Sequence, residues 1–472
     1  MYEIVNKCGD VCEVFDTSDG VVTSCSVTDL CNLFLNGVFV QGFNYDINQG
    51  VFHIDFDDSN YKQSVKNRVE RHQVDKSHPY YKMLDNYCFL AKNLYNHANY
   101  IHRQDFINGE DYWSYQDLYK HLKSDEDYPD YSNMPTHHTA LNVLRRLDKN
   151  WKSFFVSIKD YSKNPSKYLG RPKPPKYLSK DGRFVLEIPL ENIGSRIINN
   201  KLSFNKHFNG FELETHCHEK EGFSGVALVR VVPHKGYLSI EVCYKITRYL
   251  KIEKKQSSRI IGIDLGIDNF AAITSNTGMK PVLINGKGLK SINQFYNKML
   301  GKLQTGINMR MTSKISRLTR KRNNKVDDFM HKSSRYIINL CIKNNIDTIV
   351  LGYNQGWKQE VNLGKRVNQK FVAIPYYKFI KMLEYKAHDS GIKVIITEES
   401  YTSGTSFLDN ESPSKGNYNK SRRIHRGLFR SNTGILINAD VNASYQIIRK
   451  VFGEKFHPIE GIVVCPVRLN VA

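Results

Sequence analysis

One carboxylate stands at the end of an apolar run that suits the interior of a β-sheet. Residues 259–274 read Arg-Ile-Ile-Gly-Ile-Asp-Leu-Gly-Ile-Asp-Asn-Phe-Ala-Ala-Ile-Thr, so β-branched residues lead to Asp264 and Gly266 turns the chain into a second run. This pattern predicts a hairpin that places Asp264 in the middle of a sheet. A buried carboxylate is costly unless something pairs with it, and a metal ion is the commonest partner. A turn-capping aspartate is the alternative.

A second carboxylate, Asp440, opens a predicted closing helix over 441–451. Taken alone, this position is typical of a helix N-cap. Asp440 lies far from Asp264 in the sequence, so several strands and helices can form between these two residues. A nuclease whose carboxylates converge from separate elements can hold two magnesium ions about 4 Å apart, which bind the attacking and leaving oxygens of a phosphodiester. Asp264 and Asp440 are therefore candidate magnesium ligands.

The net charge of +21 over 472 residues is distributed unevenly. Residues 1–60 hold ten acidic side chains and one lysine, a balance of −9, which leaves +30 on the remaining residues. Basic charge of this size, interleaved with Tyr and Phe, indicates a phosphate-backbone ligand. We see no apolar run long enough for a membrane span, no secretion signal and no strongly basic amphipathic helix, and so expect no membrane partner.

Nine scattered cysteines, an odd number, do not form a disulfide framework and indicate a reducing, cytoplasmic location. Cys8, Cys12, Cys25 and Cys31 loosely imitate the spacing of zinc ligands. However, Cys31 falls within a predicted helix over 27–35, where a small core residue is the favoured interpretation.

Changes in composition and periodicity divide the chain into six parts. They are an acidic α+β module (1–60), a strand or linker (61–79), a helical domain (80–165), a small β-barrel (166–255), an α/β domain (256–452) and a tail (453–472). In the α/β domain, three antiparallel strands precede helix-linked parallel ones, which is the order of an RNase H-like sheet. The fold class is therefore a multidomain mixture of α+β and α/β parts.

The motifs of the α/β domain together resemble TnpB, the family of RNA-guided DNA nucleases of bacterial insertion sequences that is related to the type V CRISPR effectors and to Fanzor. The resemblance rests on Ile-Gly-Ile-Asp264-Leu-Gly-Ile, the basic helices after it, residues 378–387, Tyr-Thr-Ser403 and Asn-Ala-Asp440-Val-Asn. It covers about residues 259–451 and implies a RuvC-like nuclease domain. The helical and β-rich parts ahead of it match the family's recognition and wedge domains, and residues 1–60 have no recognised counterpart.

Two departures from the family pattern matter. The middle strand ends in Gly352, where most members have a metal-binding glutamate. The next strand ends in Glu398 and Glu399, and this resembles the Fanzor proteins and a TnpB subset in which the glutamate has moved to that neighbouring strand. Adjacent strands lie under 5 Å apart, so a glutamate can reach the same metal. We predict Glu399 as the third ligand with Glu398 as its backup; two exposed acids are the alternative.

The second departure is the loss of the zinc ribbon that many members carry. Residues 402–438 contain no cysteine and offer a basic loop instead, so zinc is not expected there. A second basic segment is the predicted helical insertion over 290–345, which has no acid from 286 to 326 and is the expected cradle of an RNA–DNA heteroduplex. The predicted nucleic-acid-binding residues are Lys302, Arg310, Lys314, Arg317, Arg320, Lys321, Arg322, Lys325, Arg422, Arg423, Arg426 and Arg430. A solvated helix face and a solvated loop are the alternatives.

The resemblance implies a magnesium-dependent, RNA-guided endodeoxyribonuclease that acts as a monomer with one guide RNA on double-stranded target DNA. The guide would read the sequence by base pairing and the protein a short flanking motif. Its guide would come from a transposon end or from a CRISPR array. The alternatives are a guided repressor that has lost cutting through Gly352, and a transposase, for which no end-binding module is evident.

Overall fold

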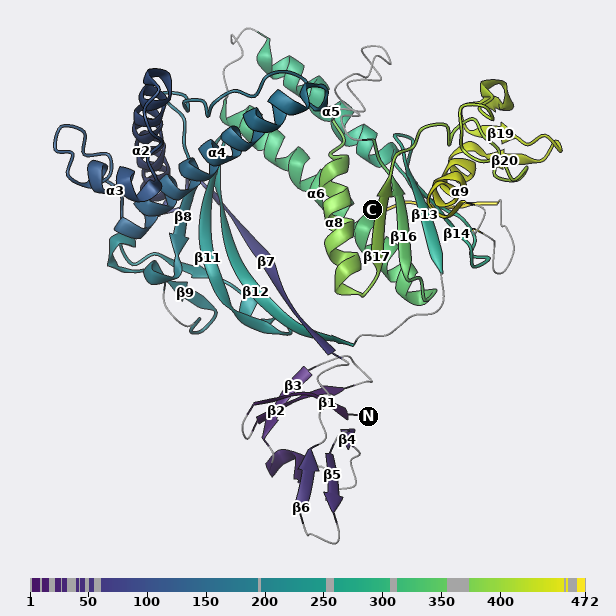
Figure 1. The fold of residues 1–472 in the computed structure, drawn as a ribbon, viewed down its shortest axis with the longest axis horizontal. Helices are drawn as coiled ribbons and strands as arrows, with labels where there is room; N and C mark the ends of the chain where they lie inside the picture. The colour runs from purple at the N-terminus through teal and green to yellow at the C-terminus, as the bar shows by residue number, and fades with distance from the viewer. Residues whose placement is uncertain are drawn as a thin grey trace. The chain divides into compact units, whose positions relative to one another are not determined.

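A computed structural model gives the fold of this chain as two compact units, residues Met1–Glu253 and Lys254–Ala472 (Figure 1). The architecture is a mixture of helices and sheets, as the sequence predicts. The structure describes residues 2–8, 11–16, 22–26, 28–31, 40–41, 43–46, 51–54, 61–193, 197–251, 259–305, 312–354, 373–453, 456 and 465–471.

The N-terminal part of the first unit consists of short strands. Strands β1 to β4 form one sheet in the order β3-β2-β1-β4, and β5 pairs with β6. A helix begins at residues 28–31, and the remainder of the helix predicted over 27–35 lies outside the described residues. The strands are β1 (Tyr2–Cys8), β2 (Val11–Asp16), β3 (Val22–Ser26), β4 (Val40–Gln41), β5 (Phe43–Asp46) and β6 (Val51–Ile54).

Three helices follow in the first unit: α2 (Tyr81–Asn108), α3 (Tyr115–Lys123) and α4 (His137–Lys163). Ser114 and Thr136 begin α3 and α4 with capping boxes, in which side chain and backbone satisfy each other's free N–H groups. These helices confirm the helical segment that the apolar periodicity predicts.

An antiparallel sheet in the order β7-β12-β11-β8 completes the unit. Its strands are β7 (Tyr61–Asp75), β8 (Leu186–Pro189), β11 (Phe223–His234) and β12 (Tyr237–Lys251), beside a separate pair β9 (Lys201–Ser203) and β10 (Glu212–Glu214). The sequence predicts a small antiparallel barrel or sandwich, and the described strands form an open sheet with β7 and β8 at its ends. The segment predicted as a strand or linker, 61–79, supplies an edge strand of this sheet because β7 pairs with β12 along its whole length.

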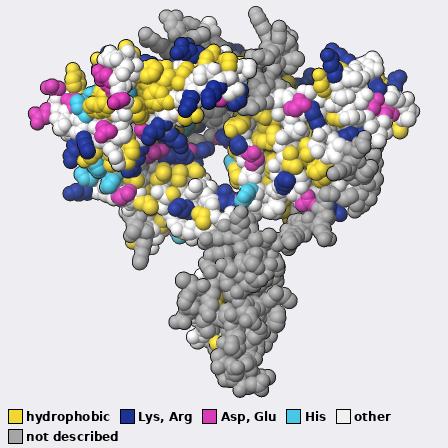
Figure 2. Space-filling model, in the orientation of Figure 1, with side chains coloured by type: hydrophobic (Ala, Val, Ile, Leu, Met, Phe, Trp, Pro, Cys, Tyr) yellow, Lys and Arg dark blue, Asp and Glu magenta, His cyan; other side chains and the backbone are white. Residues whose placement is uncertain are grey.

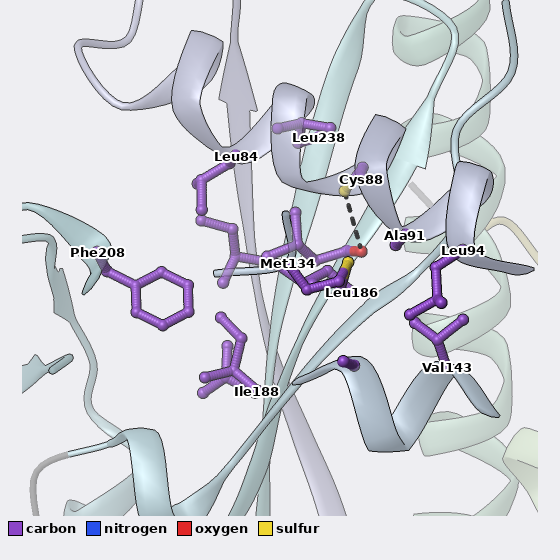
Figure 3. Packing of buried hydrophobic residues seen from close by; sticks show 14 of the residues in the cluster. Leu84, Cys88, Ala91, Leu94, Met134, Val143, Leu186, Ile188, Phe208 and Leu238 are labelled. Atoms are coloured by element: carbon purple, nitrogen blue, oxygen red, sulfur yellow. Dashed lines mark hydrogen bonds between the residues drawn. The ribbon is translucent and has the colours of Figure 1, made fainter. Parts of the chain in front are cut away.

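Helices and sheet of the first unit bury one shared core (Figure 3). Leu84 and Cys88 of α2 pack with Leu186 and Ile188 of β8, and the Cys88 thiol lies 3.9 Å from the carbonyl oxygen of Val231 in β11. The helical and β-rich segments, predicted as separate domains, therefore bury their apolar faces against each other.

The sheet of the second unit has the order β17-β16-β13-β14-β15-β21. The strands are β13 (Ile260–Leu265), β14 (Asn269–Ser275), β15 (Val282–Asn285), β16 (Thr348–Gly352), β17 (Lys393–Thr397) and β21 (Val467–Leu469). Strands β13, β14 and β15 are antiparallel, whereas β16 and β17 run parallel to β13, which is the order predicted for an RNase H-like sheet. The predicted tail differs, since β21 adds a sixth strand beside β15.

Helices cover both faces of this sheet. One face packs on α5 (Lys287–Gln304), α6 (Ser313–Lys343) and α8 (Tyr376–Asp389), and the other packs on α9 (Ala439–Phe452). A small sheet of β18 (Arg423–His425), β19 (Leu428–Arg430) and β20 (Leu436–Asn438) precedes α9. Short 3-10 helices cover Pro165–Lys167, Leu190–Asn192, Lys206–Phe208, Cys217–Glu219 and Lys420–Arg422.

Strand alternation decides what faces α9. Ile261 and Ile263 of β13 belong to the core under α5, α6 and α8, so Gly262 and Asp264 lie on the opposite face. A Cβ atom at Gly262 would collide with the backbone carbonyl oxygen of Ser444 in α9. Glycine at this position therefore lets α9 approach the face of the sheet that carries Asp264, and Figure 1 shows α9 beside β13 and β14.

Lysine and arginine side chains are spread over the described surface that Figure 2 shows, in keeping with the basic composition. None of the helices that the structure describes is both long enough and apolar enough to cross a bilayer.

The first unit also contains a buried histidine whose protonation opposes folding. His102 of α2 is 1% exposed, stacks on Tyr112 at 4.5 Å between ring centroids, and lies 5.6 Å from the ring of Trp151. Burial lowers the pKa of His102 from 6.5 to about 4, against a smaller opposing effect of Asp148.

We predict that this unit loses stability as the pH falls from 6.5 to 4. Because the pKa of His102 is lower in the folded chain, the unfolded chain binds the proton first, and the stabilisation present above pH 6.5 is lost across this window. The loss approaches about 3 kcal/mol. Urea unfolding followed by Trp fluorescence at pH 7 and pH 4.5 should show a weaker pH dependence in His102→Leu and an unchanged one in exposed His207→Leu. Equal pH dependence in all three proteins would contradict this role.

Candidate active site

Asp264 lies in the central strand β13, opposite Ala272 of β14 and on the face covered by α9. Burial raises the pKa of Asp264 well above its usual range, and the carboxylates of Glu399 and Asp440 raise it further. The guanidinium of Arg423 acts in the opposite direction. The three predicted carboxylates are thus electrostatic neighbours, although they come from β13, the segment after β17 and the first turn of α9.

Glu399 occupies the space beside Gly352. A Cβ atom built on Gly352 would lie 2.7 Å from Cγ and 2.8 Å from Oε1 of Glu399, and 2.6 Å from Cδ1 of Ile447. Gly352 ends β16, between β13 and β17, and its register partner in β17 is Thr397. The missing side chain at Gly352 therefore makes room for a carboxylate that arrives from the neighbouring strand.

The side chains of the two consecutive glutamates lie in different surroundings. Glu398 is exposed and pairs with Lys450, which lowers the pKa of its carboxyl. Glu399 points inward, and burial raises its pKa to about 7, with a further contribution from Glu398 and an opposing one from Lys450. The Asn354 side chain accepts a 2.9 Å hydrogen bond from the backbone N–H of Glu399 and fixes this turn. Geometry thus favours Glu399 over Glu398.

Asp440 is not the N-cap of α9. Asn438 takes that position, and its side chain accepts hydrogen bonds from the backbone N–H groups of Asp440 and Val441. The carboxylate of Asp440 instead accepts a 2.7 Å hydrogen bond from Asn269 of β14, and lies 3.9 Å from Arg423. The capping interpretation that the sequence left open is therefore wrong, and the carboxylate is turned toward the sheet.

The donor set suits a hard divalent cation, because carboxylate oxygens are the ligands that magnesium prefers in proteins. The Oε1 atom of Glu399 is buried and has no hydrogen-bond partner in the structure, so it is available as a ligand atom for a cation. Across the described residues, no three His, Cys, Asp or Glu side chains are drawn together closely enough to enclose a metal ion. The carboxylates therefore offer suitable ligand atoms, including the unpartnered Oε1 of Glu399, but do not enclose an ion in this structure.

The predicted basic helix α6 divides into two faces. Lys314, Arg317, Lys321 and Lys325 are exposed and recur at three- and four-residue spacing, so they share one face. Arg322 does not join them. Its guanidinium donates to the Asn293 side chain at 2.8 and 2.6 Å and to the carbonyl of Ala373 at 2.7 Å. Arg322 therefore links α6 to α5 and to the segment before α8, and its contact with nucleic acid stays a prediction.

Three further residues of the prediction lie on these helices or beside them. Lys302, near the end of α5, is exposed, and Arg320 is partly buried on α6. Arg310 lies outside the described residues.

The basic loop that precedes α9 also has inward and outward arginines. Arg422 is mostly buried and donates to both carboxylate oxygens of Glu411, at 2.7 and 2.6 Å. This ion pair is an internal support of the loop, and the nucleic-acid contact of Arg422 stays a prediction. Arg426 lies 3.2 Å from Asp268, and Arg430 is exposed. Arg423, predicted to bind nucleic acid, lies against the carboxylates.

Sequence reasoning missed the residues that orient the carboxylates. Asn269 and Asn354 hold Asp440 and the backbone of Glu399, and Lys450 holds Glu398 away. Asn269 lies in the same hairpin as Asp264, and this closeness in sequence was the one signal that could have indicated its role at the site. Asn354 and Lys450 lie in other elements, and their roles depend on tertiary packing.

A six-stranded sheet of this order, with carboxylates gathered under one helix, is the arrangement of RNase H-like proteins. Comparisons with known proteins make the class more specific. The family model described as "Probable transposase" (OrfB_IS605) matches residues 241–358, and the model described as "Cas12f1-like, TNB domain" matches residues 376–447. Over these two segments the predicted resemblance to the TnpB-like and type V effector family is confirmed.

Two curated relatives are similar to parts of the chain. The CRISPR-associated endodeoxyribonuclease Cas12f2 of Micrarchaeota archaeon (strain CG1_02_47_40) is 25% identical over 209 residues, which cover 42% of this chain and 37% of that protein. The CRISPR-associated endodeoxyribonuclease Cas12f1 of Sulfoacidibacillus thermotolerans is 31% identical over 122 residues, 26% of each chain. The chain thus spans well under half the length of these relatives.

Two solved structures also match. One, the "Cryo-EM structure of the Cas12f1-sgRNA-target DNA complex", has 15% identity and a TM-score of 0.34, and the match covers 82% of this chain and 100% of that chain. The other, the "Cryo-EM structure of CRISPR-Cas12f Ternary Complex", has 15% identity and a TM-score of 0.32, over 78% and 81% of the two chains.

We predict that divalent-cation affinity depends on Glu399 and on the absence of a side chain at position 352. Glu399→Gln removes a charged donor, and Gly352→Ala displaces that donor because the new Cβ takes its space. Both variants should weaken Mn²⁺ binding, measured by titration calorimetry on the purified protein, by about ten-fold or more. Glu398→Gln is the matched control and should bind as the unaltered protein does. Weakening by Glu398→Gln alone would reverse the assignment.

Proposed function

We propose that this protein is an RNA-guided, magnesium-dependent DNA endonuclease. The observation that carries the proposal is the insertion of Glu399 into the space beside Gly352, next to Asp264 and on the face that also receives Asp440. A nuclease of this fold requires three carboxylates from separate elements. In this chain the third would come from Glu399, which follows the neighbouring strand β17. The names of the two curated relatives, both endodeoxyribonucleases, support DNA as the substrate.

In this proposal Asp264, Glu399 and Asp440 hold the metal. Magnesium bound there supplies Lewis-acid activation of water and stabilisation of the charge that develops on the phosphate. The remaining work falls to the chain itself. Asn269 orients Asp440, Asn354 fixes the turn that carries Glu399, and the sheet holds Asp264 in place.

Basic side chains of the same unit would bind the nucleic acid. The exposed face of α6, with Lys314, Arg317, Lys321 and Lys325, suits the regular phosphate spacing of a guide RNA–DNA heteroduplex. Base pairing would then supply sequence specificity, and the first unit would read a short flanking motif. The proposed assembly is one chain with one guide RNA and double-stranded target DNA.

A guided repressor without cutting activity is the second candidate. It is favoured by one observation: the carboxylates of the described residues do not form a closed metal cage. The two candidates differ in a single respect, since both bind guide and target but only the nuclease breaks the strand.

Purification with the native RNA, followed by a cleavage screen over randomised flanking sequences, tests the proposal. We predict Mg²⁺-dependent, guide-directed cleavage that a chelator abolishes. Asp264→Asn should reduce the cleavage rate by more than about a hundred-fold while leaving guided DNA binding intact, because the amide removes the charge that holds the metal. Glu398→Gln should cleave normally. Guided binding without cleavage by the unaltered protein would establish the repressor instead.

A further inference from the structure

A basic cavity opens beside Asp440 in the second unit. Its volume is about 940 Å³, and its lining comes from four separated segments of this unit. They are the turn after β13, the end of β15 with the start of α5, the basic loop with the start of α9, and β21. Asp440 itself lines the cavity, so whatever enters it lies next to the proposed metal site.

The charges that line the cavity do not balance. Of the two acids, Asp268 pairs with Lys290 and Arg426, and Asp440 lies near Arg423. Lys287, Lys420 and Arg468 also line the cavity, are exposed, and have no acidic partner among the described residues. Three cations converging from three segments, with none of them neutralised, point to an anionic occupant.

Strand β21 places Arg468 at this cavity. It pairs in parallel with β15, where Leu283 and Arg468 are register partners, and the side chains of Asn285 and Asn470 bond at 2.7 Å. Leu469 packs against the core under α5, α6 and α8. Because strand neighbours point to opposite faces, Arg468 lies on the face of the sheet that also carries Asp264.

We propose that β21 is part of the substrate site, and that Arg468 with Lys287 and Lys420 binds phosphates of the DNA strand that is being cleaved. This inference rests on the proposed nuclease function and extends it to a segment that the sequence predicted as a tail. Phosphate contacts of this kind fix the position of a strand and carry no sequence information. Arg468 is thus a positioning residue for the strand and touches no reacting atom.

Binding of a fluorescein-labelled single-stranded DNA, measured by anisotropy without metal or guide over a series of salt concentrations, tests the inference. Arg468→Ala should weaken binding by about ten-fold and reduce the slope of log affinity against log salt by about 0.7, the value for one phosphate contact on a single strand. Arg468→Lys should restore the slope. Lys393→Ala, an exposed lysine at the far end of β17, is the control and should not change it.

Cleavage kinetics provide the second measurement. Arg468→Ala should raise the substrate concentration for half-maximal rate and leave the rate at saturation within two-fold. Lys287→Ala should act in the same way, and it keeps the test valid if Arg468→Ala fails to fold. Unaltered affinity and salt slope in both variants would overturn the inference. If the unaltered protein binds the strand as described yet never cleaves, the proposed function fails and the phosphate site stands.

Discussion

The close approach of α9 to the sheet is the constraint on which the second unit depends. Two glycines on neighbouring strands permit it: Gly262 faces the carbonyl of Ser444, and Gly352 faces Ile447 and Glu399. With a larger residue at either position, the helix would be displaced from the strands. Since α9 carries Asp440, and Glu399 lies in the space that Gly352 leaves, this one approach brings the second and third carboxylates to Asp264.

Electrostatics explain why so many cations surround these carboxylates. Burial raises the pKa of Asp264, and the neighbouring carboxylates of Glu399 and Asp440 raise it further because like charges repel. Arg423 offsets part of this repulsion, and Lys450 keeps Glu398 out of the group. The loop that carries Arg423 is itself supported by the mostly buried Glu411–Arg422 ion pair, in a stretch that contains no cysteine. A network of side chains thus performs a positioning task in a segment without cysteine.

Periodicity predicted the parts of the fold that depend on local burial. The hairpin of Asp264, the closing helix and the strand order follow from apolar runs with the correct period and turn residues. The predicted arrangement of the β-rich segment differs from the open sheet, because the sheet depends on which distant strands pair, such as β7 with β12. Local periodicity carries no information about that pairing. Strand β21 is three residues long and too short to give a periodic signal. The runs of basic residues in the sequence did not show that Arg322 and Arg422 point inward while their neighbours are exposed. A guanidinium can bind equally well to buried hydrogen-bond acceptors and to a phosphate.

The most direct test transfers the glutamate from position 399 to position 352 at the end of the neighbouring strand β16. Guided cleavage should be lost in Glu399→Gly and strongly reduced in Gly352→Glu, where two side chains compete for one space. The double variant, Gly352→Glu with Glu399→Gly, should recover a substantial part of the original rate, because one carboxylate again fills the space beside Asp264. Full activity in Glu399→Gly, or a double variant no better than either single one, would contradict the account.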